Sequence, residues 1–412
     1  MKKEKILIIG AGINQLAIIK KAKNLNYYVI VVTPFNNDPG IDIADEVIFE
    51  DIFNKEKIYN LVKNMNVCGV ISDLSDIITP TVAYLSERLG LPTFGYNNSL
   101  YFTNKAKTKE VLRKLNLSSI PNKNTKDINV AIEFANKIKY PIVIKPVDSY
   151  SSRGVYKIYN ELELKSKFYL AQEVSRAGEV IVEKYINGPQ YFSQGFVNNK
   201  KLNLFAYSDR YYFNIKDLFI PYTNIFPAKV DLNMKNRIYN YFNTIIDYLK
   251  PSFGIVWAEW ILDKSTDTLY MVEMAIRGAG ACVTTDIIPL AYGIDLENYL
   301  IKAATGKDYE INFNEIQNNA AGFYCFLLPE GIVKKVEGIE DVKKIEGIKI
   351  TNLPLIREGD IINKWKDKSS RFGPIVVFGK NRYELEIIRN KIINTLNIEV
   401  LTEDGIKNII WE

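Results

Sequence analysis

The chain has 412 residues, 47% of them hydrophobic and 25% charged, and its 53 basic and 48 acidic side chains leave a net charge of +5. This composition is typical of a globular protein with two or three domains. The basic residues are interspersed rather than clustered, which argues against nucleic acid as a partner. No apolar run is long enough to span a bilayer, so we expect no membrane partner.

Histidine is absent, and the three cysteines lie far apart in the sequence. The absence of histidine excludes Ser–His–Asp triads, Cys–His dyads and histidine-ligated metals. The cysteine spacing offers no disulfide framework, and Met1-Lys-Lys-Glu-Lys leads straight into a strand without a signal peptide. We therefore expect a cytoplasmic protein whose catalysis uses carboxylates, lysines, arginines, backbone amides and oxygen-bound metal.

Residues 1–95 alternate short apolar runs with helical segments, a pattern that predicts a Rossmann-like unit on a mainly parallel sheet. Strands are expected at 5–9, 28–33, 47–49 and 70–72, and helices at 13–24, 55–63 and 80–89. Gly10 and Gly12 begin a dinucleotide fingerprint, but Gln15 stands where its third glycine is needed. We therefore interpret these glycines as a structural turn that binds no nicotinamide cofactor.

Two lysines then occupy positions that suit phosphate binding. Lys105 opens an amphipathic helix expected to reach residue 115, and Lys145 ends the apolar strand 140–146, where a lysine must reach a counter-charge. Residues 148–154 follow as a loop of small hydroxyl side chains that can fold over phosphates, although they lack the P-loop spacing. The alternatives are a solvated lysine and a plain polar connection.

The next segment resembles a junction between two lobes. Residues 179–186 read as a strand, and Asn187-Gly188 forms a turn after it. Helices are also expected at 128–139, 236–249, 286–292 and 296–305, with strands at 192–197 and 202–208.

Two apolar runs at 254–262 and 268–274 flank the turn-forming sequence 263–267, which predicts a β-hairpin. A turn near 265–266 places Glu259 opposite residue 272 or 273, so Glu259 and Glu273 can share one face. Two carboxylates on one face favour a divalent cation such as magnesium. Arg277 and the glycines after it suit a phosphate or carboxylate partner. The alternative is two edge glutamates and a surface arginine.

In this order, these features resemble the ATP-grasp superfamily over essentially the whole chain. Within it, residues 272–280 and 287–295 are most similar to the L-amino-acid ligases, or dipeptide synthetases, and less similar to biotin carboxylase and the purine-pathway carboxylases. The resemblance implies an α/β and α+β fold. A Rossmann-like domain (1–95) would precede a two-lobed ATP-grasp domain (96–305, nucleotide-binding lobe about 120–190) and an α+β C-terminal lobe (306–412).

The resemblance also implies roles for individual residues. Lys105 and Lys145 would hold the α- and β-phosphates of ATP, with Lys145 and Arg277 catalytic and Arg277 stabilising a phosphorylated intermediate. Glu259 and Glu273 would carry Mg²⁺, for which Mn²⁺ is an alternative. The remaining ATP contacts would come from the lid and from the segment between the lobes: Ser149, Ser151, Ser152, Arg153, Gly154, Glu183, Lys184, Tyr185, Ile186 and Gln190.

Two positions depart from the family pattern. Ala275 stands where the family often has a metal-binding asparagine, which puts a second metal ion in doubt. Gln190 stands where the family often has a ribose-binding glutamate, and an amide accepts a hydroxyl proton more weakly than a carboxylate.

Residues 306–412 read as an antiparallel α+β unit. Strands are expected at 320–328, 332–336 and 375–379, and helices at 339–345 and 382–396. Arg371 lies in a turn from which it could reach substrate, but a surface position is the favoured interpretation. The implied activity is ATP-dependent joining of a carboxylate to an amine through an acyl phosphate. Both substrates would be small molecules, and the quaternary state the resemblance suggests is a homodimer. The alternatives are a carboxylase acting on bicarbonate and a non-catalytic ATP-binding protein.

Overall fold

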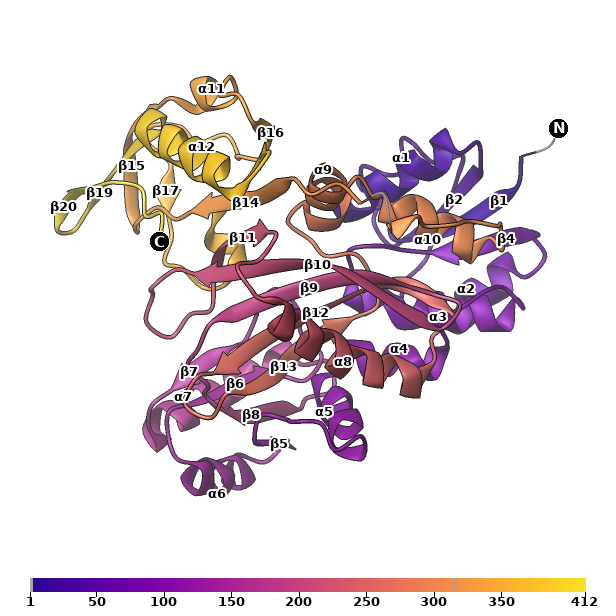
Figure 1. Cartoon of the computed structure of the whole chain (residues 1–412), viewed down its shortest axis with the longest axis horizontal. Helices are drawn as coiled ribbons and strands as arrows, with labels where there is room; N and C mark the ends of the chain where they lie inside the picture. Colours follow the sequence, from indigo (N-terminus) through magenta and orange to yellow (C-terminus); the bar gives the residue numbers. More distant parts are fainter. Residues whose placement is uncertain (1–2, 314–315) are drawn as a thin grey trace.

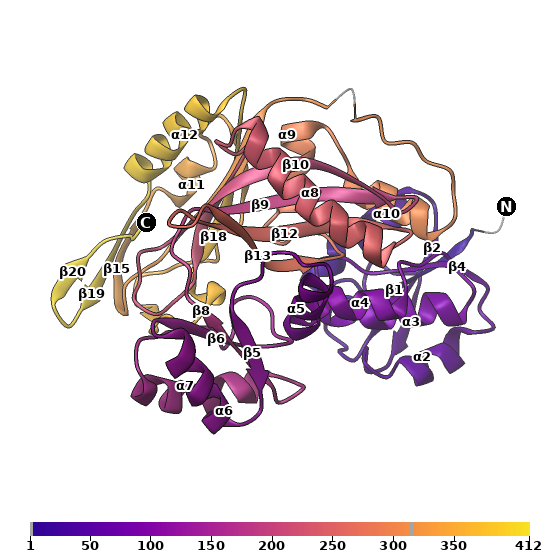
Figure 2. The same cartoon turned by 60° about the horizontal axis from the view of Figure 1, so that its bottom comes forward.

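The computed structural model describes residues 3–313 and 316–412. Three units surround one large sheet, with the N-terminal unit and the last strands at opposite ends of the long axis (Figure 1). A smaller lobe hangs below the sheet, and turning the molecule brings its α6 and α7 forward (Figure 2). No helix in the described part of the chain is long and apolar enough to cross a membrane.

The N-terminal unit confirms the predicted parallel sheet, whose strand order is β3-β2-β1-β4. Its strands are β1 (Lys5–Ile9), β2 (Tyr28–Thr33), β3 (Glu46–Phe49) and β4 (Val67–Ile71). Its helices are η1 (Ile13–Gln15), α1 (Leu16–Asn24), α2 (Lys55–Val62), η2 (Asp76–Ile78) and α3 (Thr79–Arg88). The strands are almost wholly apolar because helices cover both faces of a parallel sheet.

The glycine turn after β1 is filled by protein. Gln15 is buried, and its Nε2 donates to the Asp73 carbonyl at 2.8 Å. A side chain at Gly10 would meet the Gln15 amide at about 3.1 Å, and Gly10 has a φ of +90°. The residue that breaks the dinucleotide fingerprint thus occupies the space beside the turn and ties it to β4.

We therefore expect the purified protein to bind no nicotinamide cofactor at this turn. Titration with NADH and NADPH, followed by nucleotide fluorescence, should give no saturable signal up to millimolar concentrations, whereas Mg-ATP in a parallel calorimetric titration serves as the positive control. Tight, saturable binding of either cofactor would contradict this expectation.

The smaller lobe is an antiparallel sheet of order β5-β8-β6-β7 covered by two helices. It contains β5 (Asn122–Thr125), α6 (Ile128–Ile138), β6 (Ile142–Pro146), β7 (Tyr156–Ile158), α7 (Glu161–Val174) and β8 (Val180–Lys184). Two helices, α4 (Tyr96–Thr103) and α5 (Lys105–Lys114), connect it to the N-terminal unit. The sequence reading omitted α4 and α7; Asn160 caps α7 by accepting from the Glu163 amide at 2.9 Å.

The large sheet has eight strands in the order β13-β12-β9-β10-β11-β14-β18-β16. Five precede residue 306: β9 (Gln190–Asn198), β10 (Lys201–Tyr212), β11 (Pro221–Phe226), β12 (Phe253–Asp263) and β13 (Thr268–Ala275). Three follow it: β14 (Ala320–Phe326), β16 (Ile348–Thr351) and β18 (Phe372–Gly379). The sheet therefore continues across the expected boundary at 305/306.

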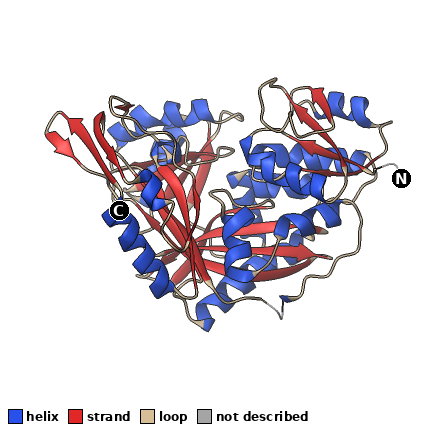
Figure 3. Cartoon of the chain, turned by 90° about the horizontal axis from the view of Figure 1, so that it is seen from above, coloured by secondary structure: helices blue, strands red, loops and turns tan. Residues whose placement is uncertain are grey.

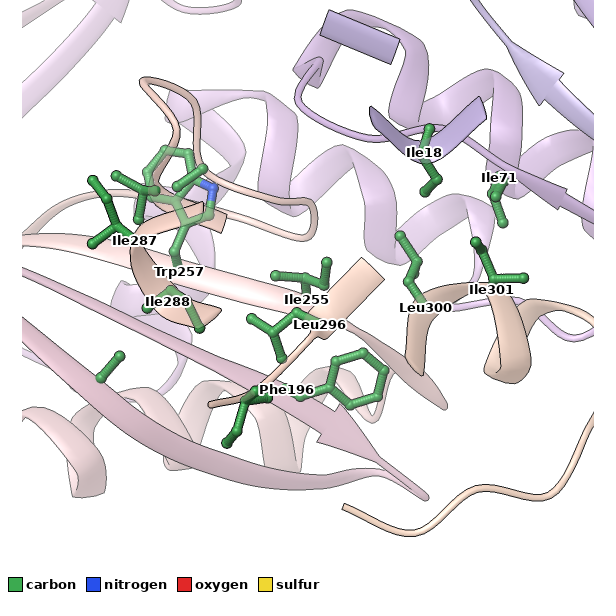
Figure 4. Close-up of a cluster of buried hydrophobic side chains, with 14 of the residues drawn as sticks. Ile18, Ile71, Phe196, Ile255, Trp257, Ile287, Ile288, Leu296, Leu300 and Ile301 are labelled. Carbon is green, nitrogen blue, oxygen red and sulfur yellow. The ribbon is translucent and has the colours of Figure 1, made fainter. Parts of the chain in front are cut away.

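Helix α8 (Leu232–Leu249) covers one face of this sheet and begins earlier than predicted, because Asp231 caps it at the Met234 amide. The other face packs against η3 (Val283–Ile287), α9 (Ile288–Tyr292) and α10 (Leu296–Ala304). Leu300 and Ile301 of α10 meet Ile18 and Ile71 of the N-terminal unit, so one apolar core joins both units (Figure 4).

The C-terminal unit adds a second small sheet of order β17-β15-β19-β20. It is formed by β15 (Gly331–Glu337), β17 (Ile361–Ile362), β19 (Asn397–Thr402) and β20 (Gly405–Lys407), with α11 (Ile339–Val342) and α12 (Arg382–Thr395). Seen from above, these strands and helices stand at the end opposite the N-terminal unit (Figure 3). The turn η5 (Lys368–Ser370) links β17 to β18.

Candidate active site

The two glutamates of the hairpin lie directly opposite each other. Glu259 of β12 and Glu273 of β13 are cross-strand partners, which confirms the predicted register. Directly paired residues of antiparallel strands project from the same face, so both carboxylates belong to the face that carries Phe192 and Trp257. The tight turn at 263–267, in which Asp263 accepts from the Ser265 amide at 2.9 Å, aligns the strands as far as Trp260 and Met271. A β-bulge beside Glu259 then shifts the register by one residue and brings Glu273 opposite Glu259.

Each of these glutamates has a cationic neighbour. Arg210 of β10 lies 3.0 Å from Glu259, and Lys105 of α5 lies 3.1 Å from Glu273. Burial raises the pKa of Glu273, but Lys105 and the more distant Lys368 and Lys145 outweigh it and lower that pKa to about 2. Glu273 can therefore stay ionised directly opposite Glu259.

Lys145 and Glu183 form the second charged cluster. Lys145 ends β6, Glu183 lies on β8, and their Nζ and Oε2 atoms are 2.6 Å apart. Lys109 of α5 approaches the other Glu183 oxygen at 3.0 Å and donates to the Met271 carbonyl at 3.2 Å. Burial raises the pKa of Glu183, but the two lysines lower it to about 2. Glu183, expected among the ATP contacts, thus bridges two lysines.

Replacing Glu183 with Gln should destabilise the protein by about 3 kcal/mol or more, because two buried ammonium groups lose their counter-charge. The wild-type contribution is present above pH 4.5 and is lost as the pH falls toward about 2, because folding lowers this pKa. Urea denaturation at pH 7 and pH 3 should therefore show that the difference in free energy of unfolding between wild type and Glu183→Gln is smaller at pH 3.

The exposed pair of Glu161 and Lys165 on α7 provides the matched control. Glu161→Gln should change stability little at either pH, because surface pairs contribute little. An equally small effect of Glu183→Gln would contradict the bridging role.

A cavity opens between the smaller lobe and the large sheet. Its walls combine apolar and charged side chains, and the segment after β8 forms one edge of it. Of the residues expected to contact ATP, most line it: Lys105, Lys145, Ser149, Ser151, Ser152, Glu183, Lys184, Tyr185, Ile186 and Gln190.

The expected lid, residues 148–154, is only partly in this cavity. Lys105 donates to the Ser149 carbonyl at 2.7 Å, and Ser151 and Ser152 adopt positive φ angles of 57° and 59°. Arg153 is exposed, and neither it nor Gly154 lines the cavity. Gly154 has a φ of +71°, and a Cβ there would approach Pro146 to 2.9 Å, so its role is to turn the loop.

A second cavity adjoins the first and shares Glu259, Glu273, Tyr150, Ser151 and Lys368 with it. Its lining includes Arg277, whose Nε donates to Asp76 at 2.6 Å and whose Nη2 donates to the other Asp76 oxygen. Arg277 also lies over the Trp257 ring at 4.9 Å. The N-terminal unit therefore supplies the partner of this arginine.

Glycine is required at position 278. The Gly278 amide donates to Asp73 at 2.5 Å, and a Cβ there would clash with that carboxylate. On the other side, Thr284 accepts from the Ala279 amide at 2.7 Å and from Gln194 at 2.5 Å. The loop after β13 is thus fixed from both sides.

Four side chains of the site were not identified from the sequence: Asp76, Arg210, Trp257 and Lys368. Arg210 lies beyond the predicted strand, and a buried arginine on a continuation of that strand is the one signal that was available. Arg371 was expected at the surface, and this is wrong: it is half-buried, donates to the Pro221 carbonyl at 2.5 Å and lines the second cavity.

The donor set fits one magnesium ion shared with phosphate oxygens. Within residues 3–313 and 316–412, no group of three or more acidic, histidine or cysteine side chains could enclose a metal. Two opposed carboxylates suit Mg²⁺, which usually takes one or two protein carboxylates and completes its shell with phosphates and water. Ala275 is buried opposite Trp257 and adds no donor.

The two lobes bring the two lysines and the opposed glutamates together around a cavity between two sheets. Residues 138–285 match the family described as "ATP-grasp domain". The chain therefore contains an ATP-grasp domain, as its sequence motifs predicted.

Relatives and solved structures extend this result. The chain is 26% identical over 277 residues to N5-carboxyaminoimidazole ribonucleotide synthase of Staphylococcus aureus, covering 66% of this chain and 69% of that protein. Its fold is similar to L-amino acid ligase from Bacillus licheniformis (TM-score 0.80, 21% identity, 97% and 99% of the chains covered). It is also similar to the biotin carboxylase domain of Hydrogenobacter thermophilus 2-oxoglutarate carboxylase (TM-score 0.71, 18% identity, 99% and 92% covered).

Proposed function

We propose that the protein is an ATP-dependent carboxylate–amine ligase that uses Mg²⁺ and acts on small molecules. The main support for this proposal is that the two cavities share part of their lining. Glu259 and Glu273 line both, so a nucleotide in one cavity would have its γ-phosphate next to whatever occupies the other. That arrangement suits phosphoryl transfer from ATP to a second substrate.

In this proposal the chain's own cations position the nucleotide. Lys105 and Lys145 hold the α- and β-phosphates, and both are buried next to acidic partners that fix their ammonium groups. Glu259 and Glu273 would hold the magnesium ion, which neutralises phosphate charge when bound. The walls of the first cavity exclude water from the triphosphate and strengthen these charge interactions.

The reaction then proceeds in two steps. A substrate carboxylate oxygen attacks the γ-phosphorus of ATP, and the bond to the β-phosphate oxygen breaks to give an acyl phosphate and ADP. A carboxylate is already ionised at neutral pH, so this step needs no base. An amine then attacks the acyl carbon, and phosphate leaves with the electron pair of the C–O bond. In this proposal Arg277, which lines the second cavity, binds the acyl phosphate oxygens.

A bicarbonate-dependent carboxylase is the second candidate. It is supported by the 26% identity to N5-carboxyaminoimidazole ribonucleotide synthase, whereas the higher TM-score of L-amino acid ligase supports ligation. A non-catalytic ATP-binding protein is the third, and the presence of both lysines, both glutamates and Arg277 argues against it.

Release of ADP separates these candidates. The protein would be incubated with Mg-ATP and, in turn, single amino acids, pairs of amino acids, small carboxylic acids and bicarbonate. ADP release that needs both a carboxylate and an amine supports ligation, with the amide product identified by mass spectrometry. Release that needs bicarbonate would overturn the proposal in favour of carboxylation, and no release with any substrate would favour the non-catalytic alternative.

A further inference from the structure

The amine that attacks an acyl phosphate must lose a proton, and the chain contains no histidine to receive it. The acceptor has to lie beside both cavities, because the amine nitrogen meets the acyl phosphate where they join. The ionisable side chains common to the two cavities are Glu259, Glu273, Tyr150 and Lys368. Both glutamates are ion-paired, and Tyr150 is exposed.

Lys368 reaches this junction from the C-terminal unit, on the one-turn helix η5. The segment around it is held at both ends. Trp365 donates to the Leu328 carbonyl at 2.7 Å, and Arg371 donates to the Pro221 carbonyl at 2.5 Å. Within the turn, Asp367 accepts from the Ser369 amide at 2.8 Å. Hydrogen bonds therefore hold the backbone of the segment that contains Lys368 in place beside the two cavities.

The ammonium group of Lys368 is available for chemistry. Among the described residues it forms no ion pair or hydrogen bond, in contrast to Lys105 and Lys145. Burial and the facing charges of Arg210 and Arg371 lower its pKa to about 8, opposed by Glu259 and Glu273 across the junction. A lysine with a lowered pKa can act as a general base, since part of it is neutral near physiological pH.

Resting on the ligase function proposed above, we propose that Lys368 is the general base of amide formation. The amine nitrogen forms a bond to the acyl carbon while the bond from that carbon to the phosphate oxygen breaks. The proton leaves the nitrogen for the neutral Nζ of Lys368, and phosphate departs with the electron pair. The lysine then returns the proton to solvent.

The first test separates the two half-reactions in the full-length protein with Mg-ATP. Hydroxylamine, a strong nucleophile, traps an acyl phosphate directly and reports the first step as acyl hydroxamate. The second step is measured as amide product from the carboxylate and amine pair that gives the highest ADP release. Lys368→Met and Lys368→Arg should keep hydroxamate formation and lower amide formation by about a hundredfold or more, the usual contribution of a general base.

The arginine variant decides between a base and a binding charge. Arginine keeps the positive charge but does not give up its proton at these pH values. If Lys368→Arg formed amide as well as the wild type, the assignment of Lys368 as the general base would be overturned, because a positive charge alone would then be sufficient for this step. An equal loss of hydroxamate and amide in Lys368→Met would also overturn it. Lys366→Met, an exposed neighbour on the same loop, is the matched control and should behave as wild type.

The pH profile provides a second readout. Amide formation by the wild type should rise with pH through about 8 and then level off, because Lys368 must lose its proton to act. Both variants should lose this rise, and a rise that persists in them would overturn the assignment. Competitive acetylation with acetic anhydride, followed by peptide mass spectrometry, should find Lys368 titrating at about 8, and titration at the ordinary value for a lysine would contradict the proposal.

The same experiments show whether the assignment of Lys368 as general base is wrong or the proposed ligase function itself is wrong. If wild type forms amide and Lys368→Arg does so equally well, only the base is wrong. If wild type releases ADP with bicarbonate alone and forms no amide, the ligase proposal fails, and the base proposal fails with it.

Discussion

Replacing Glu273 with Gln should reduce turnover by about a thousandfold or more while leaving the fold intact. The carboxylate faces Glu259 across the hairpin and would supply half of the protein's ligands to magnesium. Losing about 4 kcal/mol of charge stabilisation in the transition state corresponds to this factor. The amide keeps the volume of the side chain and can still accept from Lys105, which lies 3.1 Å away.

The measurement combines steady-state ADP release with circular dichroism and Mn²⁺ binding followed by electron paramagnetic resonance. The variant should keep its spectrum, lose nucleotide-dependent Mn²⁺ binding and lose turnover. Glu330→Gln, an exposed glutamate at the turn before β15, serves as a control that removes one carboxylate far from the cavities. Full activity in Glu273→Gln would refute the metal assignment.

Local sequence signals were sufficient for the hairpin and the N-terminal unit. The runs at 254–262 and 268–274 flank a five-residue turn that aligns the strands as far as Trp260 and Met271, and a β-bulge beside Glu259 then completes the pairing of Glu259 with Glu273. The four parallel strands were predicted because each is a short apolar run, and three of them are followed by a helical segment. In both cases the deciding interactions lie close together in the chain.

Long-range interactions were not predictable in this way. Asp76 and Arg277 are separated by 201 positions, and nothing in either local sequence indicates the other. Lys368 reaches the site from a loop whose path depends on Trp365 and Arg371, which contact residues far along the chain. Helix α7 was missed because its apolar residues do not form a clear helical stripe, although Asn160 and Glu163 mark its start.

The N-terminal unit contributes to the site through the carboxylates of Asp73 and Asp76. Gln15 holds the Asp73 carbonyl, Asp73 holds the Gly278 amide, and Asp76 holds Arg277. The filled glycine turn is therefore one end of a chain of contacts that reaches the second cavity. This connection explains how a Rossmann-like unit with an incomplete fingerprint can still matter for the chemistry of another domain.

Arg277 itself has two interpretations that differ in what they predict. If it binds the acyl phosphate, its benefit appears in the transition state, and its planar fork holds two oxygens in a way that lysine cannot copy. If it only anchors the N-terminal unit through Asp76, its loss costs stability. The structure supplies a variant that separates them: Asp76→Asn removes the charge of the partner and leaves the guanidinium in place.

We expect Arg277→Lys to lower turnover by about two orders of magnitude or more, the scale of losing one preorganised donor to developing charge. ATP affinity should change little, because Lys105 and Lys145 hold the nucleotide. Asp76→Asn should lower the melting temperature yet keep most of the turnover per folded molecule. Calorimetric ATP binding, melting curves and ADP release on both variants test this. The catalytic role would be contradicted if Arg277→Lys kept near-normal turnover and lowered the melting temperature as Asp76→Asn does. Arg277 would then act only as an anchor for the N-terminal unit.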